Sequence, residues 1–162
     1  MSRFVVVLPL VSLQPGDRFA VEDWPLHITL VPNFSADASV ETFIADLAAA
    51  SRSHASFTVS AGQDELFGPL ANIPVTIIDD SPTLTVLHRA LVATFRAHGA
   101  SFDTPAFVDD GYRAHVTITK HARAVGGEDF RLRQLAFVDM EPEPSTDYRA
   151  VIATFLLAGP VG

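Results

Sequence analysis

A short pattern that occurs twice constrains the fold of this chain more than any other feature of its sequence. Residues 26–30 and 114–118 both read apolar–His–apolar–Thr–apolar. Because alternate side chains of a β-strand face opposite sides, the histidine and the threonine of each segment would share one face while the apolar residues pack on the other. The polar members are His27, Thr29, His115 and Thr117. A fold that brings the two strands together would therefore line one groove with two imidazoles and two hydroxyls.

The rest of the sequence alternates strand and helix patterns around these two segments. Strands are indicated at residues 4–11, 26–31, 57–60, 73–78, 112–119, 130–138 and 148–157. Helical periods follow Asp37 and the Ser81-Pro82 start signal, and Gly99 ends the second helix. Helices mixed with hairpin-like strands indicate an α+β fold rather than a doubly wound parallel sheet. Since no low-complexity linker divides the chain, we expect a single domain over residues 1–162, made of two similar lobes.

The charge balance restricts the partners of this protein. Nineteen acidic residues and eleven basic ones give a net charge of −8, and Lys120 is the only lysine. Proteins that bind long nucleic acids rely on clustered lysine and arginine, so this composition argues against an extended duplex. Six of the eleven basic residues nevertheless lie from Arg113 onward. This distribution allows a local basic site near the second segment, suited to a small phosphorylated substrate or an RNA end.

Missing residue types exclude further classes of site. The chain has no cysteine, which rules out disulfides, thiolate metal sites and a cysteine nucleophile. No His-x-x-x-His spacing or carboxylate–histidine cluster indicates a metal site, and no phosphate-binding glycine loop occurs. The apolar run at residues 4–11 is too short to span a membrane and lacks a cleavage site. We therefore expect a soluble, cytoplasmic monomer without metal or membrane partners.

Residues beside the two segments are candidates for contact with a substrate. On strand parity Arg113 shares the face of His115 and could meet a phosphate, although a solvated arginine fits the start of a strand equally well. Trp24 and Tyr112 are near enough in sequence to stack on a base, and Trp24 could instead anchor its loop against the core. His88 lies beside the apolar stripe of the second helix, which indicates a packed or flanking histidine.

The paired motif resembles that of the 2H phosphoesterase superfamily, and within it the bacterial 2′-5′ RNA ligase and cyclic phosphodiesterase group. Residues 25–30 and 115–118 match the two motifs, and residues 4–9 and 148–157 resemble the outer segments. The resemblance implies a bilobal α+β fold, in which two antiparallel sheets are related by a pseudo-twofold axis with helices on the outside. It also implies activities that open 2′,3′-cyclic phosphates, or related cyclic and 2′-5′ phosphodiesters, without metal or cofactor.

The resemblance also implies a role for each motif residue. Carried over by position, His27 and His115 would be the acid–base pair, and Thr29 and Thr117 would orient the phosphate. The resemblance leans towards His115 as the base. An imidazole titrates near pH ~6.5, so one ring can be basic while the other is protonated near neutral pH. Proton transfer of this kind contributes roughly 10²–10⁴-fold to a rate.

The chain departs from the family pattern in two places that concern substrate recognition. Thr119-Lys120-His121 stands where many relatives have an arginine, and residues 137–140 lack a serine that many relatives carry. The expected function is metal-independent hydrolysis of a 2′,3′-cyclic phosphate on a small nucleotide or at an RNA end. The alternatives are RNA 2′-5′ ligation, which uses the same groups in reverse, and a nucleotide-binding module without useful turnover.

Overall fold

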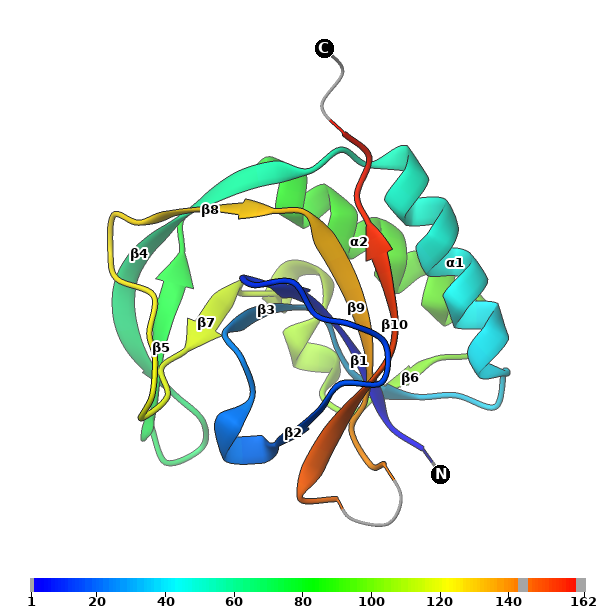
Figure 1. Ribbon diagram of the computed structural model, residues 1–162, viewed down its shortest axis with the longest axis horizontal. Helices are drawn as coiled ribbons and strands as arrows, with labels where there is room; N and C mark the ends of the chain where they lie inside the picture. Colours follow the sequence, from blue (N-terminus) through cyan, green and yellow to red (C-terminus); the bar gives the residue numbers. More distant parts are fainter. Residues whose placement is uncertain (1, 143–145, 160–162) are drawn as a thin grey trace.

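The computed structural model describes residues 2–142 and 146–159 (Figure 1). Over these residues the helices are α1 (Val40–Ser53) and α2 (Pro82–Ala97). The strands are β1 (Phe4–Pro9), β2 (Arg18–Ala20), β3 (His27–Ser35), β4 (Phe57–Phe67), β5 (Ile73–Ile78), β6 (Ser101–Phe102), β7 (His115–Thr117), β8 (Asp129–Leu132), β9 (Gln134–Asp139) and β10 (Tyr148–Leu156). Short 3-10 helices form at η1 (Val21–Asp23), η2 (Pro105–Phe107) and η3 (Asp109–Gly111).

The strands form a curled antiparallel sheet with two helices beside it, which confirms the predicted α+β class (Figure 1). The strand order is β2-β10-β9-β1-β3-β7-β5-β4-β8, and β6 pairs with β3. The two expected sheets are joined edge to edge where β3 meets β7, through a single residue pair, Ile28 and Val116. This pair separates a lobe of β2, β10, β9, β1 and β3 from a lobe of β7, β5, β4 and β8.

The two lobes do not correspond to the two halves of the sequence. The strands nearest both chain ends share the first lobe, because β9 pairs with β1 and with β10. The expected strand at residues 130–138 is in fact two strands: β8 pairs with β4 in the second lobe, and the chain continues past Arg133 as β9 in the first. Figure 1 shows this passage as the yellow-to-orange ribbon from β8 to β9. The crossing gives buried β1 a hydrogen-bonding partner on its second edge, as a buried backbone requires.

The main core lies between the curled sheet and the helices, and residues of both lobes contribute to it. Its centre is Phe34 of β3, whose ring lies 5.2 to 6.4 Å from five other phenylalanine rings, at tilted, edge-on or parallel angles. Those rings belong to Phe4, Phe43, Phe95, Phe102 and Phe137. Aromatic pairs in such arrangements add to the stability that burial of their area supplies. Phe43 of α1 and Phe95 of α2 thus fix the two helices against the sheet.

A second, smaller core covers the opposite face of the first lobe. Val5 and Val7 of β1 point to this side, with Ala136 and Val138 of β9 beside them. The chain between β1 and β3 covers them, with Leu13 buried and with Phe19 and Trp24 packed against the cluster. All six residues of β1 are therefore buried, as its unbroken apolar sequence predicts. This packing brings Trp24 to the start of β3.

The start and end of α2 follow the predicted signals. Ser81 accepts a hydrogen bond from the backbone N–H of Leu84 at 3.3 Å, and Pro82 occupies the first turn. Gly99 follows the helix with φ of +86°, a conformation that costs other residues energy. Among the described residues, no helix is long and apolar enough to cross a membrane.

Candidate active site

The pairing of β3 with β7 brings the two sequence motifs onto one face. Ile28 and Val116 lie opposite each other and are fully buried against the main core. Their neighbours point to the other side, and the antiparallel register sets His27 opposite Thr117 and Thr29 opposite His115. We call the face with these four residues the motif face. Side chains directly opposite in such a ladder are about 5 Å apart at Cβ, and diagonal ones roughly 7–8 Å. The two imidazoles lie on the diagonal, a spacing that leaves room for a phosphate group.

The motif face is accessible to a ligand. His27, Thr29 and His115 are half-buried, and Thr117 is exposed. Across β3, Val7 of the second core lies opposite Thr29, so this core and the motif face belong to the same side of the sheet. The described residues contain no group of three or more side chains suited to hold a metal ion.

Both imidazoles are oriented by the same local hydrogen bond. The Nδ1 atom of His27 lies 2.8 Å from the carbonyl oxygen of Pro25, and Nδ1 of His115 lies 2.8 Å from that of Arg113. A carbonyl oxygen can only accept, so each Nδ1 carries the hydrogen and donates it. In the neutral ring the proton-accepting nitrogen is then Nε2, which has no protein partner in either histidine within the described chain. Both Nε2 atoms are therefore available for proton transfer.

An aromatic ring lies against each imidazole. Trp24 stacks on His27 with ring centroids 4.0 Å apart and an interplanar angle of 28°. The edge of Phe67, at the end of β4, meets the ring of His115 at 4.7 Å and 65°. Sequence reasoning named Trp24 but missed Phe67, because nothing in the local pattern around residue 67 connects it with residue 115. Trp24 packs on the second core as well, the contact expected of the anchoring alternative.

These surroundings lower the pKa of both histidines. Burial lowers the pKa of His27 to about 4, with a smaller effect in the same direction from His115, while the bond to Pro25 opposes the shift. Burial likewise lowers the pKa of His115, against its bond to the Arg113 carbonyl and with help from the Arg113 charge. Loss of hydration disfavours the charged imidazolium in each case. Both rings are therefore neutral at pH 7 when the site holds no ligand.

Arg113 lies beside His115, but its charge is already paired. Its guanidinium donates to the Glu65 carboxylate and lies 5.2 Å from the centroid of the Phe67 ring. The structure thus places Arg113 near the motif face without freeing it for the phosphate contact that strand parity suggested. Lys120, which follows the end of β7, is exposed and has no hydrogen-bond or ion-pair partner among the described residues.

Tyr112 contacts the protein through its hydroxyl and through one face of its ring. Its hydroxyl donates to the backbone oxygen of Thr29 at 2.7 Å, and its ring stacks on His88 at 3.8 Å and 6°. The predicted strand 112–119 accordingly shrinks to β7, because Tyr112 leaves the sheet and a turn follows in which Thr119 bonds to Ala122. The hydroxyl and one ring face of Tyr112 are therefore occupied by the protein itself.

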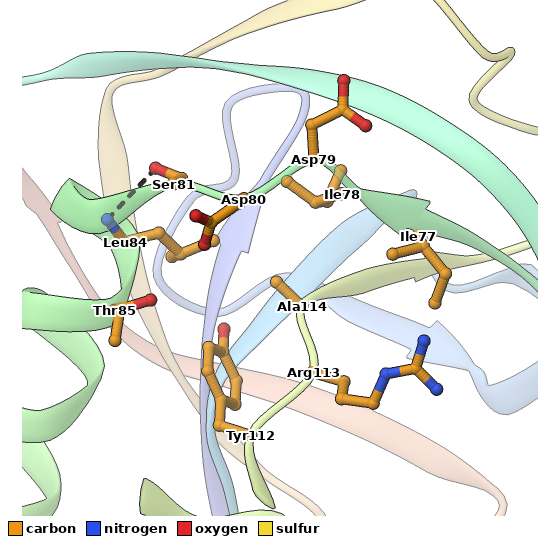
Figure 2. A pocket seen from close by; sticks show the side chains of 10 residues that line it. All are labelled: Ile77, Ile78, Asp79, Asp80, Ser81, Leu84, Thr85, Tyr112, Arg113 and Ala114. Carbon is orange, nitrogen blue, oxygen red and sulfur yellow. Dashed lines mark hydrogen bonds between the residues drawn. The ribbon is translucent and has the colours of Figure 1, made fainter. Parts of the chain in front are cut away.

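A cavity of about 240 Å³ lies beside the motif face, between β5, the start of α2 and the segment before β7 (Figure 2). Figure 2 shows Tyr112 and Asp80 on its walls and Arg113 directed away towards β5. Its described lining includes none of the four motif residues. The cavity is therefore a neighbour of the candidate active site and not its reaction centre.

A polar contact connects the loops that flank the motif face. Nε2 of His121, in the loop after β7, lies 3.2 Å from a carboxylate oxygen of Asp23, in η1 next to Trp24. The sequence gives no local signal that connects His121 with Asp23. The contact joins the second lobe to the segment that carries Trp24.

Comparison with known proteins places this fold and its paired motifs in a family. A sequence profile described as the 2′-5′ RNA ligase superfamily matches residues 12–143. The crystal structure of a phosphoesterase has a TM-score of 0.63 at 15% identity, with 98% of this chain and 99% of that chain covered. A protein of Thermus thermophilus gives a TM-score of 0.65 at 16% identity, again over 98% and 99%.

A third group of similar structures is that of LigT from E. coli. Its structure in complex with NADP⁺ has a TM-score of 0.61 at 14% identity and covers 97% of this chain and 98% of LigT. No curated protein matches the chain. The identities are low, so the structural likenesses support the fold, whereas the profile spans most of the sequence. This chain therefore belongs to the 2′-5′ RNA ligase superfamily and shares the fold of the 2H phosphoesterases.

Proposed function

We propose that this protein is a cyclic phosphodiesterase that hydrolyses a 2′,3′-cyclic phosphate, on a small nucleotide or at an RNA end, without a metal ion. The register of β3 with β7 carries this proposal, because it sets two imidazoles and two hydroxyls on one face. The backbone bonds at Nδ1 direct both Nε2 atoms to proton transfer. LigT from E. coli has crystal structures in complex with 3′-AMP and with phosphate, ligands that a site for nucleotide phosphates would accept.

In the proposed reaction His27 is the general base and His115 the general acid. Burial shifts the pKa of His27 further down than that of His115, so a single proton on the pair resides mainly on His115. Nε2 of neutral His27 takes a proton from water as the water oxygen bonds to phosphorus. The bond from phosphorus to one ribose oxygen breaks, and the proton on Nε2 of His115 passes to that oxygen. This order is the reverse of the one towards which the family resemblance leans.

The threonine hydroxyls act on the charge of the phosphate in this proposal. Thr29 stands opposite His115 and Thr117 opposite His27, so each hydroxyl can donate to a non-bridging oxygen while the imidazoles reach the attacking and leaving oxygens. Donors fixed in advance at the place where charge develops stabilise a transition state without further reorganisation. The histidine of each strand thus stands opposite the threonine of the other strand. This arrangement suits an in-line displacement, in which the attacking and leaving oxygens lie on opposite sides of phosphorus.

The two other expected functions have less support from the site. RNA 2′-5′ ligation would use the same groups in reverse, but the net charge of −8 and the pairing of Arg113 with Glu65 leave little positive charge for extended RNA. A module that only binds nucleotides would not need two oriented imidazoles with free Nε2 atoms. We therefore place hydrolysis first.

The test measures release of monophosphate from a panel of 2′,3′-cyclic nucleotides in the presence of EDTA, from pH 4.5 to 8. The variants are His27→Ala and His115→Ala, and His98→Ala is the matched control, because His98 caps α2 and pairs with Asp46 away from the motif face. We expect turnover that resists the chelator, falls by at least about 10²-fold in each motif variant and is unchanged in the control. Turnover that EDTA abolishes, or that survives in either motif variant, would refute the proposal.

A further inference from the structure

Beside a bulge in β3, two backbone carbonyls of the first motif strand accept hydrogen bonds from side chains outside the sheet. Val7 of β1 is opposite Thr29 and Val6 is opposite Val31, so Leu30 is the extra residue between them. On its other edge β3 pairs with β7 only at Ile28. A bulge disrupts the ladder locally and leaves its extra residue unpaired. The carbonyl oxygens of Thr29 and Leu30 lie at this irregular part of the ladder.

Two side chains from distant segments bond these carbonyls. The Tyr112 hydroxyl donates to the oxygen of Thr29 at 2.7 Å, and Nδ1 of His88 donates to that of Leu30 at 2.7 Å. Nε2 of His88 accepts from the backbone N–H of Asp109 at 3.0 Å, so both ring nitrogens are used and the neutral tautomer is fixed. His88 is fully buried and lies parallel to the Tyr112 ring at 3.8 Å.

Tyr112 also belongs to the segment that orients the second motif. The residue after it, Arg113, supplies the carbonyl that accepts from Nδ1 of His115. A single tyrosine thus contacts the first motif through its hydroxyl and leads directly, through its backbone, to the bond that orients the second histidine. A shift of this residue would move Thr29 and His115 relative to each other.

Resting on the proposed function, we propose that Tyr112 is a positioning residue that holds the two motifs in register for the reaction, with His88 fixing the plane of its ring. Tyr112 does not touch the substrate in this account. Its hydroxyl fixes the peptide of Thr29, the residue whose side chain faces the phosphate. The register pair Ile28–Val116 alone is a short connection for two lobes, and Tyr112 adds a second one beside it.

The informative substitution is Tyr112→Phe, which keeps the ring that borders the cavity of Figure 2. Removing the whole side chain would enlarge that cavity and break the stack on His88, whereas phenylalanine keeps the ring and deletes only the hydroxyl. The chain offers a matched control, since its other tyrosine is Tyr148, which is exposed on β10 below the Arg18 guanidinium. Tyr148→Phe makes the same chemical change away from the motif face.

The first measurement is steady-state hydrolysis of a 2′,3′-cyclic nucleotide at a temperature where all variants are folded. We expect kcat of Tyr112→Phe to fall about tenfold with KM within about threefold of the wild type, because the lost bond serves the transition state rather than ligand binding. Tyr148→Phe should match the wild type in both constants. Unchanged kcat in Tyr112→Phe, or an equal loss in Tyr148→Phe, overturns the proposal, as does a change confined to KM.

A second measurement does not depend on turnover. Long-range ¹H–¹⁵N NMR spectra report the ring nitrogens of His27 and His115 as the pH is varied. We expect the signals and midpoints of both rings to change in Tyr112→Phe and to stay as in the wild type in Tyr148→Phe. Identical imidazole spectra in Tyr112→Phe and wild type overturn the positioning role. If the wild type hydrolyses no cyclic nucleotide, the proposed function fails while these spectra still decide the role of Tyr112.

Discussion

Replacing His27 by asparagine should make the protein less sensitive to acid. Burial lowers the pKa of folded His27 to about 4, whereas an imidazole in the unfolded chain titrates near pH ~6.5. Between these values the unfolded chain binds a proton that the folded protein excludes, so the free energy of unfolding falls as the pH falls. The amide N–H of asparagine can donate to the Pro25 oxygen in place of Nδ1, so the variant keeps the local bond and loses the titration.

The magnitude follows from the two pKa values. The full gap corresponds to about 3 kcal/mol, and the part lost between pH 7 and pH 5 is about 2 kcal/mol. Urea unfolding of the wild type and His27→Asn at these two pH values, with the free energy extrapolated to water, measures the difference directly. We expect the wild type to lose about 2 kcal/mol more than the variant on acidification.

A matched variant separates this effect from histidine replacement in general. His54 also bonds a backbone oxygen through Nδ1, that of Ala50, but it lies at the end of α1 away from the motif face. His54→Asn should therefore follow the acid sensitivity of the wild type. If wild type and His27→Asn lose the same stability to within about 0.5 kcal/mol, or if NMR places the pKa of His27 at its ordinary value, the reasoning from burial is wrong.

Three further predictions concern the same site. The pH profile of kcat/KM should be a bell, with a rising limb near pH 4 from deprotonation of His27 and a falling limb below about pH 6.5 from the lowered pKa of His115. A maximum above pH 7 would contradict the assignment of His27 as base and His115 as acid. Arg113→Gln should change KM for a cyclic nucleotide by less than about threefold, because Glu65 already neutralises the guanidinium, and a larger rise in KM would show that Arg113 leaves Glu65 to bind the phosphate. Ile28→Ala should lower the free energy of unfolding in urea by about 2–5 kcal/mol, because the Ile28 side chain is fully buried where the lobes meet. Ile73 is 44% exposed, so Ile73→Ala should stay within about 0.5 kcal/mol of the wild type.

The local features of the fold could be predicted from the sequence because they depend on residues a few positions apart. The unbroken apolar run of β1 indicates a buried strand, and the Ser81-Pro82 signal with Gly99 brackets α2 to within a residue or two. The polar residues of the candidate site could be predicted for the same reason, because each histidine lies two positions from its threonine. Strand alternation placed His27 with Thr29 and His115 with Thr117, and the structure pairs the two strands so that all four share one face.

Features that depend on distant segments could not be found in this way. A single strand pattern at residues 130–138 does not show that its two halves pair in different lobes, since that depends on which edges of β1 and β4 lack a partner. Phe67 carries no motif, and only the β4–β5 hairpin brings its ring to His115. Strand alternation gives Arg113 the side of the strand expected for a phosphate contact, but its guanidinium is paired with the Glu65 carboxylate of β4.

The sequence by itself therefore determined the chemistry that this protein can offer, two imidazoles and two hydroxyls, each pair set on one side of its strand by the two-residue period of a β-strand. Only the tertiary structure decided how those groups work together. The register at Ile28 and Val116 set their spacing, and burial lowered the pKa of both rings. Tyr112, which the sequence placed in a predicted strand over residues 112–119, lies outside β7 and bonds to Thr29. Spacing, hydration and long-range hydrogen bonds depend on which segments meet in space, and the pattern of neighbouring residues does not contain that information.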